Sequence, residues 1–384
     1  MSVKHITLVG SFGASNIGDE AILESTLQML HTHSESLGIH VLSPTPEDTQ
    51  EFYHAYSVTS SVPIPFGVRS IIKKSPAFIK SLKILRSTDI VFFPGGGLFT
   101  DNESIYAVLL WALHFFFFKF LLGKKVVFGG QSIGPLKSFL AKNITRWVLA
   151  SSDGFFVRDE ESLLCIKKEF PKYVSKVSLL LDPVCFIDTS VEHKGVFTTT
   201  KKPLQIALSL RPWHGSEHKL IHALGKIFKK ISETQPIHLH LIPMQYKGSE
   251  DITPLQHMSY VLHEMNIPST LHAPRSYTEV LQILSDCQAS IGMRLHFLIL
   301  SALSHTPLLA LSYSTKVEGF LKRINLHSSF NIASLHTAEL EATVEHFIKS
   351  YSDQQTYLDV FIAQTKAKKD IEANTLLSAL GLVR

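Results

Sequence analysis

Short apolar runs alternate with predicted helices along the first half of the chain. The runs "ITLVG", "DIVFFPGGG", "KVVFGG" and "GFFV" each end at a glycine or a charged residue and lead into a longer segment with helical character. This alternation is typical of βαβ units, in which crossover helices join parallel strands. It restarts with "LQIALSL", "IHLHLIP", "ASIG" and "PLLALSY". The pattern therefore predicts an α/β protein with two doubly wound parallel sheets.

Two Rossmann-like domains account for this pattern in a chain of 384 residues. We expect an N-terminal domain over 1–190, a linker near 189–202 and a C-terminal domain over 203–336. The polar segment 337–384 is expected to form two helices that pack back on the domains. Ligands of open α/β sheets bind at the carboxyl ends of the strands, so two facing domains would enclose the site in a central cleft.

Composition and charge narrow the class of partner. The chain has 45% hydrophobic and 18% charged residues, as a folded globular protein does, and its formal net charge of +4 comes without long Lys/Arg runs. This balance favours a small anion or a membrane surface over nucleic acid. The three cysteines, Cys165, Cys185 and Cys287, lie far apart without metal-ligand spacing, which fits core thiols in a reducing compartment. Because the N-terminus also lacks the apolar stretch of a signal peptide, we expect a cytoplasmic protein.

One apolar run, 107–125, is the candidate for contact with a membrane. It is shorter than the ~20 residues that a transmembrane helix needs, and His114 and Lys119 interrupt it. Two interpretations stay open. The run is either a buried helix of the first domain, or a surface that leans on the inner face of the membrane with Lys124 and Lys125 near anionic headgroups. The oligomeric state also stays open.

The loop "GSFGASNIGDEAIL" follows the first predicted strand and opens a helix. Its small residues let a ligand approach the backbone, and the helix N-terminus offers N–H groups, so Asn16 is a candidate ligand-binding residue. The spacing is not GxGxxG, so it supports a dinucleotide site only weakly. Asp19 has two interpretations: a carboxylate that complements the helix dipole, or a general base for a substrate hydroxyl.

Two further strand ends, "FFPGGGLFTDN" and "FGGQSIGP", are crowded with glycine. Gly95, Gly96 and Gly97 are consecutive, and each is entropically expensive to order, so we expect a loop that faces a ligand. Asp101 and Gln131 follow on these loops and are candidates for contacts with substrate hydroxyls.

Cationic side chains follow predicted strands in both domains. Arg158 comes after "GFFV" and Arg211 after "IALSL". Arg294 and His296 come after "ASIG", and Lys316 after "LLALSYST". With Arg294 and His296 two residues apart at a strand end, both side chains are expected at the rim of the site while the residue between them faces the core. We expect few nearby carboxylates to neutralise these cations, which suits a small, highly charged anion such as a phosphorylated carboxylate.

Nine fragments in order carry a resemblance to a known family. They are "NIGDEAIL", "PGGGLFTD", "GQSIGP", "VRDEESL", "DPVCFI", "SLRPW", "IPMQY", "GMRLHFLILSAL" and "YSTKVEGFL". Together they resemble the polysaccharide pyruvyl transferase family over nearly the whole chain. The resemblance implies a GT-B-like fold and the transfer of the enolpyruvyl unit of phosphoenolpyruvate to two hydroxyls of a sugar, which leaves a pyruvate ketal and phosphate.

The resemblance also implies roles for the cations. The family's arginine after the "V" strand matches Arg158, and its lysine after the later strand matches Lys316. Its arginine and histidine in "MRLH" match Arg294 and His296. The cations would hold the carboxylate and phosphate of phosphoenolpyruvate. His296 is the candidate acid that protonates the methylene carbon, because imidazole is a competent acid near its usual pKa of ~6.5.

The acceptor implied by the resemblance is a cell-surface glycan or its lipid-linked precursor, whose hydroxyls Asp19 or Asp101 would orient or deprotonate. Neither a metal nor a cofactor besides the donor is expected. An alternative is a GT-B glycosyltransferase in which the same cations bind the diphosphate of a nucleotide sugar and Glu318 binds the ribose. A third class, a catalytically idle sugar-binding or scaffold protein, gives the cations no partner.

Overall fold

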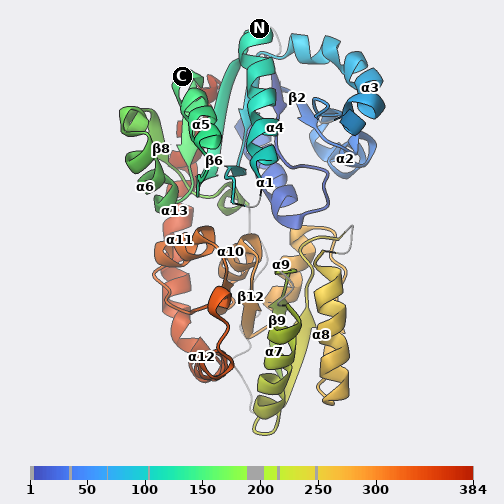
Figure 1. Cartoon of the computed structure of the whole chain (residues 1–384), viewed down its shortest axis with the longest axis vertical. Coiled ribbons are helices and arrows are strands. Elements are labelled where there is room, and N and C mark those ends of the chain that lie inside the picture. The colour runs from blue at the N-terminus through green and yellow to red at the C-terminus, as the bar shows by residue number, and fades with distance from the viewer. Residues whose placement is uncertain are drawn as a thin grey trace. The chain divides into compact units, whose positions relative to one another are not determined.

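The computed structural model describes residues 4–33, 37–66, 68–102, 104–187, 203–213, 217–246 and 250–383 (Figure 1). The chain divides into two compact units. Unit 1 comprises Met1–Ala14, Asp19–Ile187 and Ala367–Arg384, and unit 2 comprises Ser15–Gly18 and Asp188–Lys366. The predicted linker near 189–202 lies outside the described residues.

Unit 1 is built on an eight-stranded sheet of order β3-β2-β1-β4-β6-β7-β8, with β5 paired to β6. Every pairing between these strands is parallel. The central strands are continuous runs of buried residues, as expected for a sheet covered by helices on both faces. The strands are β1 Lys4–Leu8, β2 Leu37–Leu42, β3 Thr59–Ser61, β4 Ile90–Phe93, β5 Gly96–Phe99, β6 Lys125–Ile133, β7 Gly154–Val157 and β8 Val177–Leu179.

Helices follow the strands of unit 1 in the predicted alternation. The core beneath them contains stacked rings of Phe93, Phe128 and Phe155, and Phe99 meets Phe128 edge to face. The helices are α1 Ile17–His33, α2 Pro46–Phe52, α3 Val68–Ser87, α4 Ile105–Phe116, α5 Phe139–Ser151 and α6 Glu160–Glu169, with short turns at His54–Tyr56, Phe117–Leu121, Pro171–Lys176 and Pro183–Phe186.

Unit 2 is built on a six-stranded parallel sheet of order β11-β10-β9-β12-β13-β14. Its strands are β9 Leu204–Ser209, β10 Ile237–Leu241, β11 Ser269–Leu271, β12 Ala289–Gly292, β13 Leu308–Ser312 and β14 Ser329–Asn331. Its helices are α7 Glu217–Ser232, α8 Ile252–Glu264, α9 Tyr277–Ser285, α10 Leu295–Leu303, α11 Thr315–Arg323 and α12 Thr337–Ser350, with short turns at Ile332–Ser334 and Tyr351–Gln354. The two parallel sheets with alternating helices confirm the predicted α/β class.

Two segments depart from the predicted domain limits. Residues Ser15–Gly18 fall in unit 2 because their backbone bonds to the segment after β10. The last helix, α13 Gln355–Leu380, is shared, since unit 2 ends at Lys366. By contrast, α12 packs wholly in unit 2, where Leu340 and Val344 join the core.

The apolar run 107–125 forms most of α4 and the π turn that follows it. One face is buried, and His114 belongs to that face. Its Nε2 accepts a hydrogen bond from the Ile64 N–H (3.2 Å), and its Nδ1 lies 2.9 Å from the Leu110 carbonyl oxygen. Burial lowers the pKa of His114 to about 4, which keeps the ring neutral inside the apolar helix.

The other face of this run leaves apolar side chains exposed, including Phe116, Phe120 and Leu121. Lys119 is paired with Asp153 (2.7 Å), and the Lys124 Nζ donates to the Arg86 carbonyl (2.7 Å). No helix within the described ranges has both the length and the apolar character needed to span a bilayer. Peripheral contact with a membrane stays a prediction.

Candidate functional site

The carboxyl edge of the unit 2 sheet gathers four of the predicted site residues. Strands β9, β12 and β13 are neighbours in this parallel sheet, so their carboxyl ends meet at one edge. Arg211 follows β9, and Lys316 lies in the first turn of α11 after β13. After β12, Arg294 directly precedes α10 and His296 lies in the first turn of that helix. The structure thus brings these four side chains to neighbouring strand ends.

His296 is on a helix, which corrects one expectation. Helix α10 begins at Leu295 with Arg294 at its N-cap position, so Arg294 and His296 do not alternate along a strand. β12 ends at Gly292, where a Cβ would lie 2.3 Å from the Phe297 ring, so glycine at this position lets Phe297 in the first turn of α10 pack against the strand end. Both polar side chains still lie at the strand end, now in the first turn of a helix.

Gly18 packs directly against the imidazole of His296. A Cβ atom at Gly18 would lie 2.0 Å from His296 Nδ1, which is far inside contact distance. Only glycine therefore allows this approach. His296 is half-buried, and the loop of residues 15–18 from the start of the chain forms one wall of its surroundings within unit 2.

Backbone hydrogen bonds hold this loop to the segment after β10. The Ile17 N–H donates to the Met244 carbonyl (2.8 Å), and the Tyr246 N–H donates to the Ser15 carbonyl (3.0 Å). Asn16 forms an antiparallel bridge with Gln245. The Asn16 side-chain oxygen accepts the Gly18 N–H (2.9 Å), a turn that starts α1. Asn16, a predicted ligand-binding residue, thus has a structural contact of its own.

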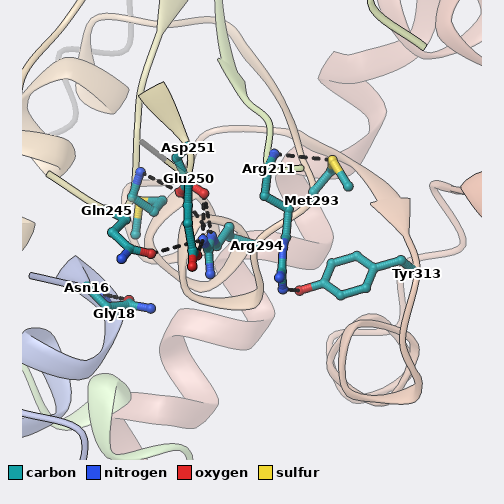
Figure 2. A network of polar contacts seen from close by, with 10 residues as sticks. Asn16, Gly18, Arg211, Gln245, Glu250, Asp251, Met293, Arg294 and Tyr313 are labelled. Carbon is teal, nitrogen blue, oxygen red and sulfur yellow. Dashed lines mark hydrogen bonds and ion pairs between the residues drawn. The ribbon is translucent and has the colours of Figure 1, made fainter. Parts of the chain in front are cut away.

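Arg294 is the centre of the polar network in Figure 2, where its guanidinium faces Asp251, Glu250 and Gln245. Its Nε lies 2.9 Å from Asp251 Oδ2, and its Nη2 lies 2.5 Å from Asp251 Oδ1, a bidentate fork. The Nη2 is also 3.7 Å from Glu250 and 3.5 Å from the Gln245 side-chain oxygen. Burial alone would lower the pKa of Arg294, but the hydrogen bonds to Asp251 outweigh it and raise the pKa.

Asp251 is a site residue that the sequence did not single out. Its side chain is fully buried, and Oδ2 also accepts the Met244 N–H (3.1 Å), which joins Arg294 to the segment that carries the 15–18 loop. The only signal in the sequence is an acidic residue just before a predicted helix. The expectation of few carboxylates near the cations is wrong here. Even so, within the described ranges the Arg294 Nη1 has no acceptor, and the side chain is 13% exposed.

Arg211 packs against an aromatic side chain, Tyr313, at the same edge of the sheet. Its Nη1 donates to the Tyr313 hydroxyl (3.0 Å), and its guanidinium carbon lies 5.2 Å from the centre of the Tyr313 ring (Figure 2). Trp213 packs against Tyr313 with ring centroids 4.9 Å apart. Tyr313 directly follows β13, so the contact links the ends of β9 and β13, the strands on either side of β12, and fixes the direction of the guanidinium.

Arg158 lies in unit 1, in a different kind of environment. It follows β7 as predicted, but its side chain is only 5% exposed. The Nη1 donates to Asp182 (2.6 Å), the Nε donates to the Ser132 hydroxyl (2.7 Å), and Asp159 lies 4.0 Å away. The expectation of few carboxylates is wrong for this arginine too. Donor binding by Arg158 stays a prediction, and these contacts show that much of its guanidinium is already engaged.

The glycine-rich strand ends of unit 1 also have structural reasons. A Cβ at Gly95 would lie 3.1 Å from Pro183, and Gly96 has a φ of +108°, which L side chains rarely adopt. Gly97 is half-buried. Gln131 is fully buried, and its Nε2 donates to the carbonyls of Phe93 (3.0 Å) and Gly129 (3.1 Å). Its contact with a substrate stays a prediction.

Asp101 holds the loop that starts α5. Its two carboxylate oxygens accept the N–H groups of Lys137 and Ser138, both at 2.7 Å. Burial alone would raise the pKa of Asp101, but these hydrogen bonds outweigh it and lower the pKa. A carboxylate with two amide donors and a lowered pKa is a weak base. Asp19, the other candidate, is half-buried in the first turn of α1.

Glu20 is a titrating group that the sequence did not single out as a site residue. It is buried beside the loop after β1, where one oxygen accepts the Gly13 N–H (2.7 Å) and the other accepts the Tyr53 hydroxyl (2.8 Å). Burial raises the pKa of Glu20 to about 7, against the opposing effect of these hydrogen bonds. The sequence places Glu20 next to Asp19 but gives no sign that its side chain turns inward.

Comparisons with known proteins agree with this architecture. The chain is similar in fold to UDP-GlcNAc 2-epimerase from Neisseria meningitidis bound to UDP-GlcNAc, with a TM-score of 0.62, 12% identity and 98% and 99% of the two chains covered. It is also similar to Anabaena Alr3699/HepE in complex with UDP and glucose, with a TM-score of 0.62, 12% identity and coverages of 98% and 100%. A glycosyltransferase from Rickettsia africae is similar with a TM-score of 0.59 and 8% identity, over 98% of this chain and 97% of that one. No curated protein sequence matches the chain.

Two parallel sheets with alternating helices, together with these similarities, confirm the predicted GT-B-like α/β fold. The sequence model of the family "Polysaccharide pyruvyl transferase" matches residues 16–315, most of the chain. The protein belongs to this family and is a transferase.

Proposed function

We propose that the protein transfers the enolpyruvyl unit of phosphoenolpyruvate to two hydroxyls of a sugar in a cell-surface polysaccharide or its lipid-linked precursor, and releases phosphate. One observation carries the proposal. His296, an imidazole able to deliver a proton, lies against Gly18 at the same sheet edge as Arg294, Arg211 and Lys316. An acid beside several cations suits a donor that is highly charged and must be protonated on carbon.

The cations of unit 2 match the charge of the donor. Phosphoenolpyruvate carries up to three negative charges on its carboxylate and phosphate. Arg294 binds Asp251 through Nε and Nη2, so its Nη1 group can donate hydrogen bonds to the donor substrate. Arg211 is oriented by its hydrogen bond to Tyr313. Lys316 adds a point charge from the first turn of α11. Because these side chains supply the positive charge, we propose that the transfer needs no metal ion, and a chelator is expected to leave the turnover number unchanged.

The chemistry assigns a separate part to His296. The imidazolium gives its proton to the methylene carbon of the donor, which becomes a methyl group, and the neighbouring carbon becomes electrophilic. One sugar hydroxyl adds to that carbon and loses its proton. The bond from that carbon to the phosphate oxygen then breaks and phosphate leaves with the electron pair. The second hydroxyl adds to the same carbon and loses its proton, which closes the ketal. Asp19, which directly follows Gly18, is the proposed group that orients or deprotonates a hydroxyl.

A nucleotide-sugar transferase is the alternative. The solved structures of similar fold hold UDP-GlcNAc, or UDP and glucose, in their own sites. In this chain Arg211 and Arg294 would then bind a diphosphate, and Glu318, in the first turn of α11, would bind the ribose. The two proposals require different donors, so donor binding decides between them.

Thermal stabilisation by each donor tests the proposal. A ligand at 100 times its Kd stabilises the folded state by about 2.7 kcal/mol, so phosphoenolpyruvate is expected to raise the Tm clearly. Pyruvate carries only the carboxylate of the donor and inorganic phosphate only its phosphate, so these two are the matched controls and are expected to raise the Tm less. A rise with UDP-GlcNAc or UDP-glucose and none with phosphoenolpyruvate would transfer the assignment to the alternative.

A further inference from the structure

Three imidazoles meet on the outer helices of unit 2, away from the residues discussed above. His218 and His222 are one turn apart on α7, and His257 faces them from α8. Their ring centroids are 4.7 Å apart for His218 and His222, 4.3 Å for His218 and His257, and 5.5 Å for His222 and His257. One ring nitrogen from each lies within 4.8 Å of the others.

The helices that carry these side chains are held firmly together. Gly225 and Val261 lie one turn further along α7 and α8, and a Cβ at Gly225 would be 2.6 Å from the Val261 side chain. The inward faces of both helices belong to the core of unit 2, including Leu224 and Met258. The backbone positions of the three histidines are therefore set by packing, and the imidazoles need only rotate about their side-chain bonds.

None of the three imidazoles has a hydrogen-bond partner or a carboxylate contact within the part of the chain that the structure describes. His218 and His222 are exposed and His257 is half-buried, so water reaches the cluster. Three neutral rings gain little from one another, and protonated rings would repel. A shared cation is the partner that such a cluster suits.

We propose that His218, His222 and His257 bind one Zn²⁺ ion that links α7 to α8. Two histidines at i and i+4 on one helix face form a known pair of metal ligands, and imidazole suits the later first-row divalent metals. Zinc bound by imidazoles at 2.0–2.1 Å needs ring nitrogens roughly 3.3 Å apart in tetrahedral geometry, which the cluster reaches by small side-chain rotations. Water would take the fourth position.

The ion would stabilise the segment that carries Asp251, the partner of Arg294. Asp251, the partner of Arg294, immediately precedes α8, and His257 lies six residues further along the same segment. A link between α7 and α8 would oppose fraying of the α8 N-terminus. The ion is assigned to stability and not to the chemical step, so this inference does not rest on the proposed function.

Zinc binding by the full chain without a polyhistidine tag tests the proposal. The metal-stripped protein is dialysed against Zn²⁺, bound metal is counted by atomic absorption, and the Tm is measured with and without Zn²⁺. We expect one ion per chain and a Tm that rises to saturation. His257→Ala and His218→Ala are each expected to weaken binding by at least ~100-fold, because even loss of a partner behind a ligand costs about 10–100-fold.

His263→Ala is the matched control, since His263 is an exposed histidine on α8 outside the cluster. It is expected to bind zinc as the wild type does. His218 is exposed, so its variant is expected to fold, and circular dichroism checks this. The proposal is overturned if the wild type binds no zinc, if the His218 and His257 variants both bind it with wild-type affinity, or if several ions bind equally in every variant.

Discussion

In both units a cationic side chain follows a buried parallel strand, but the two cations have different surroundings. In unit 1, Arg158 is 5% exposed and its guanidinium is engaged by Asp182 and Ser132. In unit 2, Arg294 is also paired, but its side chain is 13% exposed. His296, two residues further along the chain, is half-buried. A cation after a parallel strand is therefore compatible with a closed ion pair or with an open binding edge.

The arrangement of the partner carboxylates around each guanidinium explains the difference. Asp182 and Asp159 surround Arg158 from two sides, and each is itself nearly buried. Arg294 has its strongest partner, Asp251, on one side only. Loss of a cation whose partners surround it is expected to cost folding free energy, whereas a cation held from one side still has donors for the proposed ligand. The following predictions test this distinction, beginning with the largest expected effect.

Replacement of His296 tests whether the open edge is catalytic. His296→Asn is expected to lower the turnover number by on the order of 10²–10⁴-fold, because an amide forms hydrogen bonds but delivers no proton. The apparent KM for phosphoenolpyruvate should change much less. Steady-state kinetics with phosphate release as the readout measures both constants.

His305→Asn is the matched control for His296, since His305 is a histidine near the other end of the same helix and is paired with Asp359 (3.0 Å). It should turn over as the wild type does. A folded His296→Asn enzyme with wild-type turnover would leave His296 as a structural residue and remove the acid from the proposed mechanism.

Replacement of Arg158 tests whether the edge of unit 1 is closed. Arg158→Met leaves Asp182 buried without its cation, and breaking a buried pair in this way costs about 3–5 kcal/mol of folding free energy. Adding Asp182→Asn should recover part of that loss, since the amide oxygen can still accept the Val184 N–H. Urea denaturation measures both variants.

Donor kinetics of the Arg158→Met/Asp182→Asn double variant complete this test. We expect a KM for phosphoenolpyruvate within about twofold of the wild-type value, a change of no more than ~0.4 kcal/mol. If the double variant regains stability and yet shows a tenfold higher KM, Arg158 binds the donor as the family resemblance implies. The distinction between the two edges would then fail.

The pH dependence of stability tests whether the buried Glu20 carboxyl of unit 1 is protonated in the folded protein. Its folded pKa of about 7 lies above the unfolded value of 4.5, mainly because of burial. Protons are then held more tightly by the folded state, so its contribution to stability is present below pH 4.5 and is lost as pH rises through 7. The difference of about 2.5 pKa units corresponds to about 3 kcal/mol at alkaline pH.

Glu20→Gln removes this loss and keeps the acceptor for the Gly13 N–H. Its Tm is expected to rise relative to the wild type between pH 5 and pH 8. Glu24→Gln is the matched control, because Glu24 is on the same helix and accepts the Tyr56 hydroxyl (2.7 Å), but is half-exposed. Equal pH profiles for the wild type and Glu20→Gln would show that the buried carboxyl is not protonated in the folded protein.

Much of the fold could be predicted from the sequence, because buried parallel strands leave a direct signal. The apolar runs in "DIVFFP" and "LLALS" coincide with β4 and β13, whereas β6 continues past "KVVFGG" to Ile133. The family could be predicted for the same reason, since its fragments sit on these strand ends.

The partners of the site residues could not be predicted, because contacts between distant segments leave no local pattern. Nothing in "SEDIT" indicates that Asp251 holds Arg294, and nothing in "SNIGD" indicates that Gly18 touches His296. Likewise, "HKLIH" displays the spacing of His218 and His222, but His257 joins them only through the packing of two helices. The glycine run itself gives no sign that a Cβ at Gly95 would lie 3.1 Å from Pro183.

Replacement of Arg294 by lysine tests whether the planar guanidinium, and not only its charge, is needed to bind the donor. Arg294→Lys keeps a positive charge beside Asp251 but replaces the planar fork by a single ammonium group, which cannot bind Asp251 on one side and present a second pair of donors on the other. The KM for phosphoenolpyruvate is expected to rise about tenfold, or ~1.4 kcal/mol, with a smaller change in turnover. Arg275→Lys, at an exposed arginine of the same unit, is the matched control and should leave both constants unchanged. If Arg294→Lys instead lowers turnover and leaves the KM unchanged, Arg294 acts only in the transition state, and the ground-state contacts with the donor belong to Arg211 and Lys316.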